Sequence, residues 1–207
     1  MADAKAFWDK VAPKYAAQPV KDPGAYAHTL DRTRTYLAET DRVLELGCGT
    51  GSTALLLAKD VAHITATDLA PRMIEIAKTK VAEQGVGNVE FRAADLTQTD
   101  TDGTPYDVIL AFNLLHLIRD RAGAVRRSYE MLKPGGYFIS KTVCLRENGW
   151  IMWIMVAVLR AVGIAPYVAI LGITELEKTL RDAGFEIVET GDYPKKPVNR
   201  FVVARKV

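Results

Sequence analysis

Three glycines at alternate positions carry the clearest chemical signal in the sequence. Gly47, Gly49 and Gly51 directly follow the apolar run 43–46, and a helical pattern begins at residue 52. Glycine tolerates positive φ and lets a ligand lie against bare backbone. A buried strand, a tight glycine turn and a helix N-terminus together form a nucleotide-binding corner. The sequence therefore predicts a nucleotide-like ligand at residues 47–51.

Acidic residues follow two later strand patterns. Asp68 ends the pattern 62–68 and lies about 20 residues past the glycines, the spacing at which an acid meets ribose hydroxyls. Asp95 follows the strand pattern 89–93. Both acids stand at carboxyl ends of predicted strands, which is the binding edge of a parallel sheet. We therefore expect both carboxylates to contact the ligand.

The glycine spacing also indicates which ligand is favoured. A dinucleotide site has the pattern G-x-G-x-x-G, but Ser52 stands where the last glycine is needed, and no lysine follows Gly51 as in a phosphate-binding P-loop. S-adenosylmethionine has a carboxylate, a sulfonium and a ribose but no phosphate. It needs close backbone approach and an acid for the ribose diol, which this pattern supplies.

Strand and helix patterns alternate along the chain. Five strand patterns alternate with three helix patterns, at 43–46, 52–58, 62–68, 71–81, 89–93, 107–112, 122–132 and 137–142. This alternation predicts an α/β fold with a doubly wound, mostly parallel sheet. A capping box at Thr174–Glu177 opens a further helix, and Gly184 closes it. Two last strands are expected at 185–189 and 200–205.

The stretch 43–51 strongly resembles motif I of the class I S-adenosylmethionine-dependent methyltransferases. The residues Asp68, 94–96, 113–117 and 132–136 match the later landmarks of that family in order and spacing. The resemblance covers roughly residues 41–206. It implies one methyltransferase domain over 1–207, with a seven-stranded sheet whose last strand is antiparallel. Residues 1–40 and 150–172 match no family-wide motif and are expected to form a helical cap and an apolar helical insert.

The resemblance assigns cofactor contacts residue by residue. Glu45 and the corner residues Gly47, Cys48, Gly49 and Gly51 wrap the methionine part of S-adenosylmethionine. Asp68 takes the ribose hydroxyls, and Leu69 and Met73 flank the adenine. Asp95 accepts from the adenine amino group with Leu96 beside it, and the Asn113 backbone lies near the methyl end. Two alternatives stay open: Glu45 as a structural carboxylate, and Met73 as plain helix core.

Methyl transfer from a sulfonium mainly requires alignment of donor and acceptor, with a general base where the acceptor must lose a proton. His116 is the leading candidate base because it follows strand 107–112 near the expected methyl position, although a histidine among leucines is often only packed. Tyr15 and His28 are weaker candidates. They belong to predicted helices at 7–15 and 26–38, which form either a lid or a packing layer. No acidic cluster suggests a metal.

The apolar segment 150–171 is the main clue to the acceptor. It is too short to span a membrane. It predicts a cap over a pocket for a small apolar or amphipathic acceptor, a peripheral membrane contact or a homodimer interface. The favoured function is therefore methyl transfer to such a small molecule. The alternatives are N-methylation of phospholipid headgroups at a membrane surface, a dinucleotide-dependent oxidoreductase and a non-catalytic binding module.

The overall composition sets further bounds. The formal net charge is +2 in 207 residues, so no basic excess suggests a nucleic-acid partner. The two cysteines, Cys48 and Cys144, lack metal or redox spacing, and the N-terminus has no apolar stretch of signal-peptide length. These features predict a reduced, cytoplasmic protein.

Overall fold

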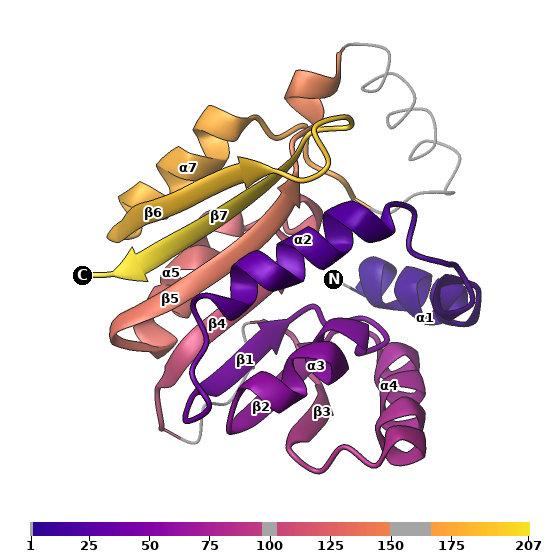
Figure 1. The fold of residues 1–207 in the computed structure, drawn as a ribbon. Helices are drawn as coiled ribbons and strands as arrows, with labels where there is room; N and C mark the ends of the chain where they lie inside the picture. Colours follow the sequence, from indigo (N-terminus) through magenta and orange to yellow (C-terminus); the bar gives the residue numbers. More distant parts are fainter. Residues whose placement is uncertain (1, 97–102, 150–166) are drawn as a thin grey trace.

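A computed structural model describes residues 2–96, 103–149 and 167–207 of the chain, and it forms three layers around a central sheet (Figure 1). The sheet has seven strands in the order β3-β2-β1-β4-β5-β7-β6. Their bounds are β1 Arg42–Leu46, β2 His63–Asp68, β3 Val89–Ala93, β4 Tyr106–Phe112, β5 Leu132–Val143, β6 Phe185–Asp192 and β7 Asn199–Lys206. Strands β1 to β5 pair in parallel, whereas β7 is antiparallel to both β5 and β6. The predicted mostly parallel sheet with an antiparallel last strand is confirmed.

Helices cover both faces of this sheet, as the alternating pattern predicts. Their bounds are α1 Ala2–Ala16, α2 Pro23–Arg34, α3 Ser52–Leu57, α4 Pro71–Gln84, α5 Arg121–Met131 and α7 Ile173–Asp182. In Figure 1, α2 and α3 lie in front of the sheet and α5 and α7 lie behind it. Short 3-10 turns occupy Ala58–Asp60 (η1), Leu115–Leu117 (η2) and Leu145–Asn148 (η3).

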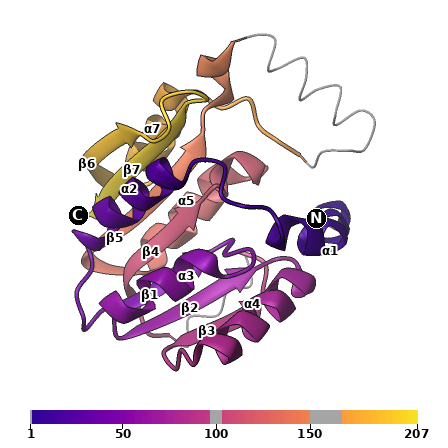
Figure 2. The same ribbon diagram turned by 45° about the vertical axis from the view of Figure 1, so that its right-hand side comes forward.

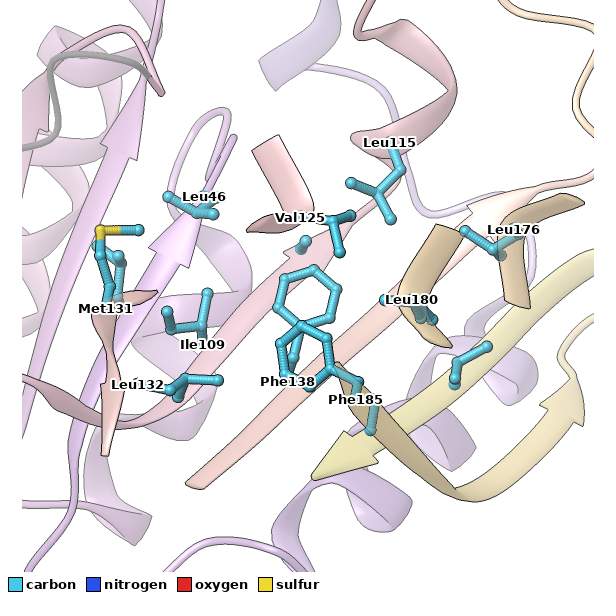
Figure 3. Close-up of a cluster of buried hydrophobic side chains, with 14 of the residues drawn as sticks. Leu46, Ile109, Leu115, Val125, Met131, Leu132, Phe138, Leu176, Leu180 and Phe185 are labelled. Atoms are coloured by element: carbon cyan, nitrogen blue, oxygen red, sulfur yellow. The ribbon is translucent and has the colours of Figure 1, made fainter. Parts of the chain in front are cut away.

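Apolar side chains fill the space on each face of the sheet. Figure 3 shows the cluster under α5 and α7, where Phe138 of β5 meets Phe185 of β6 with ring centroids 5.5 Å apart. Leu176 and Leu180 of α7 close this cluster and are fully buried. A second cluster lies under α2 and α3, around Leu30 and Leu57. Burial on both faces explains why the central strands are continuously apolar.

Helix α2 begins and ends earlier than its pattern predicts. Asp22 caps its first turn, accepting from the amide of Ala25 at 2.9 Å, so the helix starts before residue 26. Hydrogen bonds tie the C-terminal end of α2, and the residues just after it, to the edge strand β6. Arg32 Nε donates to Glu189 of β6 at 2.8 Å, and the Tyr36 hydroxyl donates to the same carboxylate at 2.6 Å. These bonds hold α2 across β5, β7 and β6.

The predicted capping box at Thr174–Glu177 is wrong. Helix α7 begins at Ile173 with Gly172 as its N-cap, so Thr174 already lies inside the helix and makes no cap bond. The amide of Ile173 instead donates to Glu147 Oε1 at 2.9 Å. A carboxylate from the distant turn η3 therefore caps the first turn of α7, the role that the local sequence pattern assigned to Thr174. Strand β5 also starts before residue 137, because residues 132–136 continue the strand.

Candidate functional site

The glycine corner lies where the strand order reverses, between β1 and its neighbours β2 and β4. Gly47, Gly49 and Gly51 have φ values of 66°, 54° and 77°, in the left-handed region that favours glycine. The Cys48 amide donates to Thr67 of β2 at 2.9 Å, and the Gly51 amide donates to Cys48 at 3.0 Å. The turn is therefore built from positive-φ backbone, as its sequence predicts.

The Asp68 carboxylate links the end of β2 to this corner. Its Oδ2 accepts from the Gly49 amide and its Oδ1 from the Ala70 amide, each at 2.9 Å. Burial raises the pKa of Asp68 above its ordinary value, and these two amide bonds oppose the rise. Each oxygen keeps further acceptor capacity. The residue both fixes the corner and presents an acceptor at the edge where the ribose is expected.

Glu45 lies on the same edge and is 3% exposed. The Ala54 amide bonds its carboxyl group, and burial raises the pKa of that group to about 8. Among the described residues, its Oε2 is buried without a hydrogen-bond partner. Its bond to α3 agrees with the structural alternative. The orphaned oxygen also fits S-adenosylmethionine, whose methionine ammonium is a donor that such an atom needs.

The other assigned cofactor residues divide into two groups. Leu69, Asp95 and Leu96 are partly buried just beyond β2 and β3. Cys48 is 8% exposed, and burial raises the pKa of its thiol well above the ordinary value. Met73 is 2% exposed and packs with Ala12 of α1, which agrees with its alternative role as helix core.

Asn113 directly follows β4 and has a φ of 54°, although it is not a glycine. Its amide donates to the Lys141 carbonyl of β5 at 2.7 Å, and its Oδ1 accepts from Asn199 of β7 at 3.3 Å. A non-glycine residue in this conformation costs free energy and often marks a functional edge. The structure thus places an unusual backbone at the position assigned to the methyl end.

Helix α1 packs against α4, as the packing alternative for the N-terminal helices predicts. Ala12 and Trp8 pack against Met73 of α4, and Asp9 accepts from the Arg72 amide at the start of α4 at 2.9 Å. Figure 2 shows α1 beside α4. Tyr15, at the end of α1, has its Cε1 3.7 Å from where a Cβ on Gly49 would lie. The helix therefore packs on α4 and brings Tyr15 to the glycine corner.

The three candidate bases occupy different surroundings. Tyr15 is 48% exposed, and burial together with Asp68 and Glu45 raises the pKa of its hydroxyl. His28 is exposed on α2 and contacts the Tyr193 ring with centroids 4.3 Å apart. His116, in η2, is 8% exposed, and burial lowers the pKa of its imidazole to about 4. His116 is therefore neutral near pH 7, but only weakly basic.

Sequence reasoning missed a buried lysine at this edge. Lys141 of β5 is 6% exposed, and its ammonium donates to Thr29 Oγ1 of α2 at 3.0 Å. The available signal was a charged residue interrupting the apolar strand pattern 137–142. Tyr26, on the same helix, shares a 3.0 Å hydrogen bond with Thr53 at the start of α3. Helix α2 therefore brings polar groups to the site as well as apolar ones.

Replacing His116 with glutamine will reduce the loss of stability in acid. Between pH 6.5 and about 4, the unfolded chain binds a proton at this residue and the folded chain does not, so stability falls as pH falls. The free energy of unfolding of the wild type should therefore drop about 1.5 kcal/mol more than that of the variant between pH 6.5 and pH 5. Urea unfolding at both pH values measures this difference, and equal losses would contradict the burial of a neutral imidazole.

The described residues form neither a metal-binding cluster nor a membrane-spanning helix. No group of three or more His, Cys, Asp or Glu side chains in residues 2–96, 103–149 and 167–207 is placed to hold a metal ion. Within the same ranges, no helix is long and apolar enough to cross a membrane. Of the apolar segment 150–171, residues 150–166 lie outside the described residues. Leu171 is buried and Ile170 is 40% exposed.

The chain is similar to several known proteins. A family model described as a methyltransferase domain matches residues 43–136. A demethylmenaquinone methyltransferase of Leptospira interrogans is 35% identical over 116 residues, which are 54% of this chain and 47% of that protein. A ubiquinone biosynthesis O-methyltransferase of Xylella fastidiosa is 30% identical over 165 residues, 75% of this chain and 65% of that protein. The chain thus spans about half to two thirds of the length of these curated relatives.

Among solved structures, the [4+2]-cyclase SpnF has a TM-score of 0.80 and 22% identity, and the match covers 98% of this chain and 94% of that one. This likeness shows the fold. The family model covers the glycine corner, Asp68 and Asn113, and the sheet has the strand order implied by the sequence resemblance. The chain belongs to the class I S-adenosylmethionine-dependent methyltransferases.

Proposed function

We propose that this protein transfers a methyl group from S-adenosylmethionine to a small apolar or amphipathic acceptor. The observation that carries the proposal is the glycine corner, with the Asp68 carboxylate bonded to the Gly49 amide at 2.9 Å. The orphaned Glu45 Oε2 supplies a second acceptor on the same edge. A corner with these two carboxylates and no phosphate-binding lysine fits S-adenosylmethionine better than a dinucleotide.

The proposed roles of the residues follow from their positions. Asp68 holds the ribose hydroxyls, Glu45 accepts from the methionine ammonium, and the bare backbone of Gly49 allows close approach of the cofactor. Tyr15 covers that backbone from α1. The bound cofactor supplies a methyl group on a sulfonium, which is already a good leaving group. The protein's remaining task is to align the acceptor and, for an acidic acceptor, to take its proton.

The acceptor class is the finer part of the proposal. The two curated relatives are named for demethylmenaquinone and for ubiquinone biosynthesis, which points to ring-bearing acceptors. The aromatic side chains near the start of β7 agree with such an acceptor. The Tyr193 ring lies 4.3 Å from His28 and 5.9 Å from Phe201, centroid to centroid. We therefore favour an aromatic or quinone-like small molecule over a phospholipid headgroup.

Incubating the protein with methyl-labelled S-adenosylmethionine and a cell extract tests this function. Label should enter an organic-extractable small-molecule fraction, and it should be absent when the extract is omitted. The Asp68→Ala variant serves as the control for labelling by other enzymes in the extract. Label in phospholipid, protein or nucleic acid would contradict the acceptor class. Absence of transfer to every fraction, with S-adenosylhomocysteine still bound, would support a non-catalytic module.

A further inference from the structure

Lys141 is a buried lysine whose amino group has no carboxylate partner among the described residues. Its side chain is 6% exposed and makes one hydrogen bond among the described residues, to Thr29 Oγ1 at 3.0 Å. The Thr29 hydroxyl donates to the Ala25 carbonyl at 2.7 Å, so it acts as an acceptor toward the lysine. An ammonium has three donors. Lysine is almost never fully buried unless it is paired.

The neighbours of Lys141 are mainly aromatic. Phe112 of β4 and Phe201 of β7 stand in register with it on either side. The ring of Tyr193, in the turn between β6 and β7, lies against Phe201, and His28 of α2 lies against Tyr193. The strands beside Lys141 thus flank it with rings rather than carboxylates, which suits a flat aromatic ligand with an acidic group.

Few titratable groups face this lysine. They are Asp22, the N-cap of α2, which favours the charged form, the exposed His28 of α2, and Tyr193 in the turn between β6 and β7. Arg200 of β7 bonds instead to Glu177 of α7, on the opposite face of the sheet. Burial lowers the pKa of Lys141, with Asp22 opposing. Burial and the scarcity of nearby carboxylates therefore both act against the charged form of this lysine.

Lys141 also lies beside the position assigned to the transferred methyl group. Its carbonyl accepts from the Asn113 amide at 2.7 Å, so the two residues are direct neighbours at the carboxyl edge of β4 and β5. The lysine side chain extends from this point toward α2, on the face of the sheet that also bears Glu45. An acceptor held by Lys141 would approach the site from the side of α2.

We propose that Lys141 binds the acidic hydroxyl group of an aromatic acceptor and takes its proton, a role that rests on the proposed methyl transfer. The phenolic O–H bond breaks and its proton passes to the neutral amine, which leaves an ammonium–phenolate pair. The phenolate oxygen then forms a bond to the methyl carbon of S-adenosylmethionine. The carbon–sulfur bond breaks and its electron pair stays on sulfur. Lys141 later releases its proton to water.

Titration of bound 4-nitrophenol tests the ion pair without any methyl transfer. The absorbance of this probe reports its ionisation directly, and S-adenosylhomocysteine can fill the donor site. Opposite charges at close range shift a pKa by about 1–3 units, so the pKa of bound 4-nitrophenol should fall by about one unit or more in the wild type. The fall should vanish in Lys141→Met. The exposed Lys178→Met variant is the control and should behave as the wild type, because Lys178 pairs with Asp182 within α7.

Lys141→Arg separates charge from proton transfer. Arginine keeps the cation but cannot accept a proton at working pH. It should therefore restore the lowered pKa of the bound phenol, while methylation of phenols stays at least tenfold below the wild-type rate. Wild-type rates should rise as the pH rises through the pKa of the lysine, and the arginine variant should lack that rise. This pattern would distinguish a base from a structural lysine.

Several results would overturn the proposal. They are no binding of 4-nitrophenol to the wild type, an equal pKa of the bound probe in Lys141→Met, or unchanged phenol methylation in that variant. Loss of S-adenosylhomocysteine affinity in a folded Lys141→Met would instead assign the lysine to the cofactor. Failure of the wild type to bind S-adenosylhomocysteine would reject the proposed function itself, and calorimetry detects that separately from the phenol titration.

Discussion

Replacing Asp68 with alanine will weaken binding of S-adenosylhomocysteine by about 100-fold or more, because hydrogen bonds to a charged group contribute roughly 1.5–3 kcal/mol each. The loss has two sources. The ribose hydroxyls lose their expected acceptor. The amides of Gly49 and Ala70 lose theirs as well, since in the wild type each amide nitrogen lies 2.9 Å from an Asp68 carboxylate oxygen. The corner that approaches the cofactor is therefore loosened at the same time. Isothermal titration calorimetry measures the change directly.

Asp68→Asn is the sharper variant of this experiment. A carboxylate accepts from both amides, whereas the amide side chain of asparagine has one accepting oxygen and turns a donor toward the other N–H. We therefore expect a similar loss of affinity with almost unchanged side-chain volume. Asp182→Asn is the matched control, since that carboxylate is 61% exposed on α7 and pairs with Lys178. Wild-type affinity in Asp68→Asn would remove Asp68 from the cofactor site.

Replacing Gly51 with alanine will destabilise the fold itself. Gly51 has a φ of 77°, and a Cβ there would lie 2.5 Å from Phe91 Cζ and 2.9 Å from the Ala77 Cβ. The left-handed backbone costs roughly 1–2 kcal/mol and overpacking roughly 1–3 kcal/mol, so we expect a loss of about 3 kcal/mol. For a protein of this size that is a fall in Tm of about 10 °C. Thermal unfolding followed by circular dichroism measures it.

Two other glycines separate the causes of this loss. Gly85 has a φ of 66°, but a Cβ there would meet nothing within 4 Å, so Gly85→Ala carries the backbone cost alone. Gly87 has neither a positive φ nor a close neighbour, and Gly87→Ala should leave Tm nearly unchanged. The expected order of destabilisation is Gly51, then Gly85, then Gly87. Equal effects at Gly51 and Gly85 would show that contact with Phe91 and Ala77 costs nothing.

Local sequence patterns predicted the framework of the site because its chemistry is local. The corner needs glycines at fixed intervals, and Asp68 needs only to end the next strand, so both are visible in the order of residues. The antiparallel placement of β7 came from the family resemblance, since two strand patterns joined by a turn do not reveal where they enter a sheet.

Features that depend on distant residues could not be predicted in this way. Glu147 caps α7 from η3, which displaced the capping role assigned to Thr174. The burial and the hydrogen bond of Lys141 depend on α2, which places Thr29 over β5. The two residues are more than a hundred positions apart in the sequence. The sequence position of Met73 fits both an adenine contact and a residue of the helix core. Only the packing of α1 against α4 favours the core role.

The fold does not by itself determine the reaction. A protein described as a [4+2]-cyclase shares this architecture with a TM-score of 0.80. Residues at the carboxyl edge of the sheet must therefore carry the chemistry. Substitutions of Asp68 and Lys141, at this edge, are therefore expected to change the reaction more than the fold.

The attachment of α1 bears on how long a ligand stays bound. The helix is held to α4 by a small apolar contact around Ala12 and by the bond from the Arg72 amide to Asp9, and it carries Tyr15 to Gly49. We expect a cofactor seated beneath Tyr15 to leave only when this contact opens. On that proposal, the docking strength of one helix sets the residence time of the spent cofactor. We therefore expect substitution of Asp9, outside the reaction centre, to change the rate of product release.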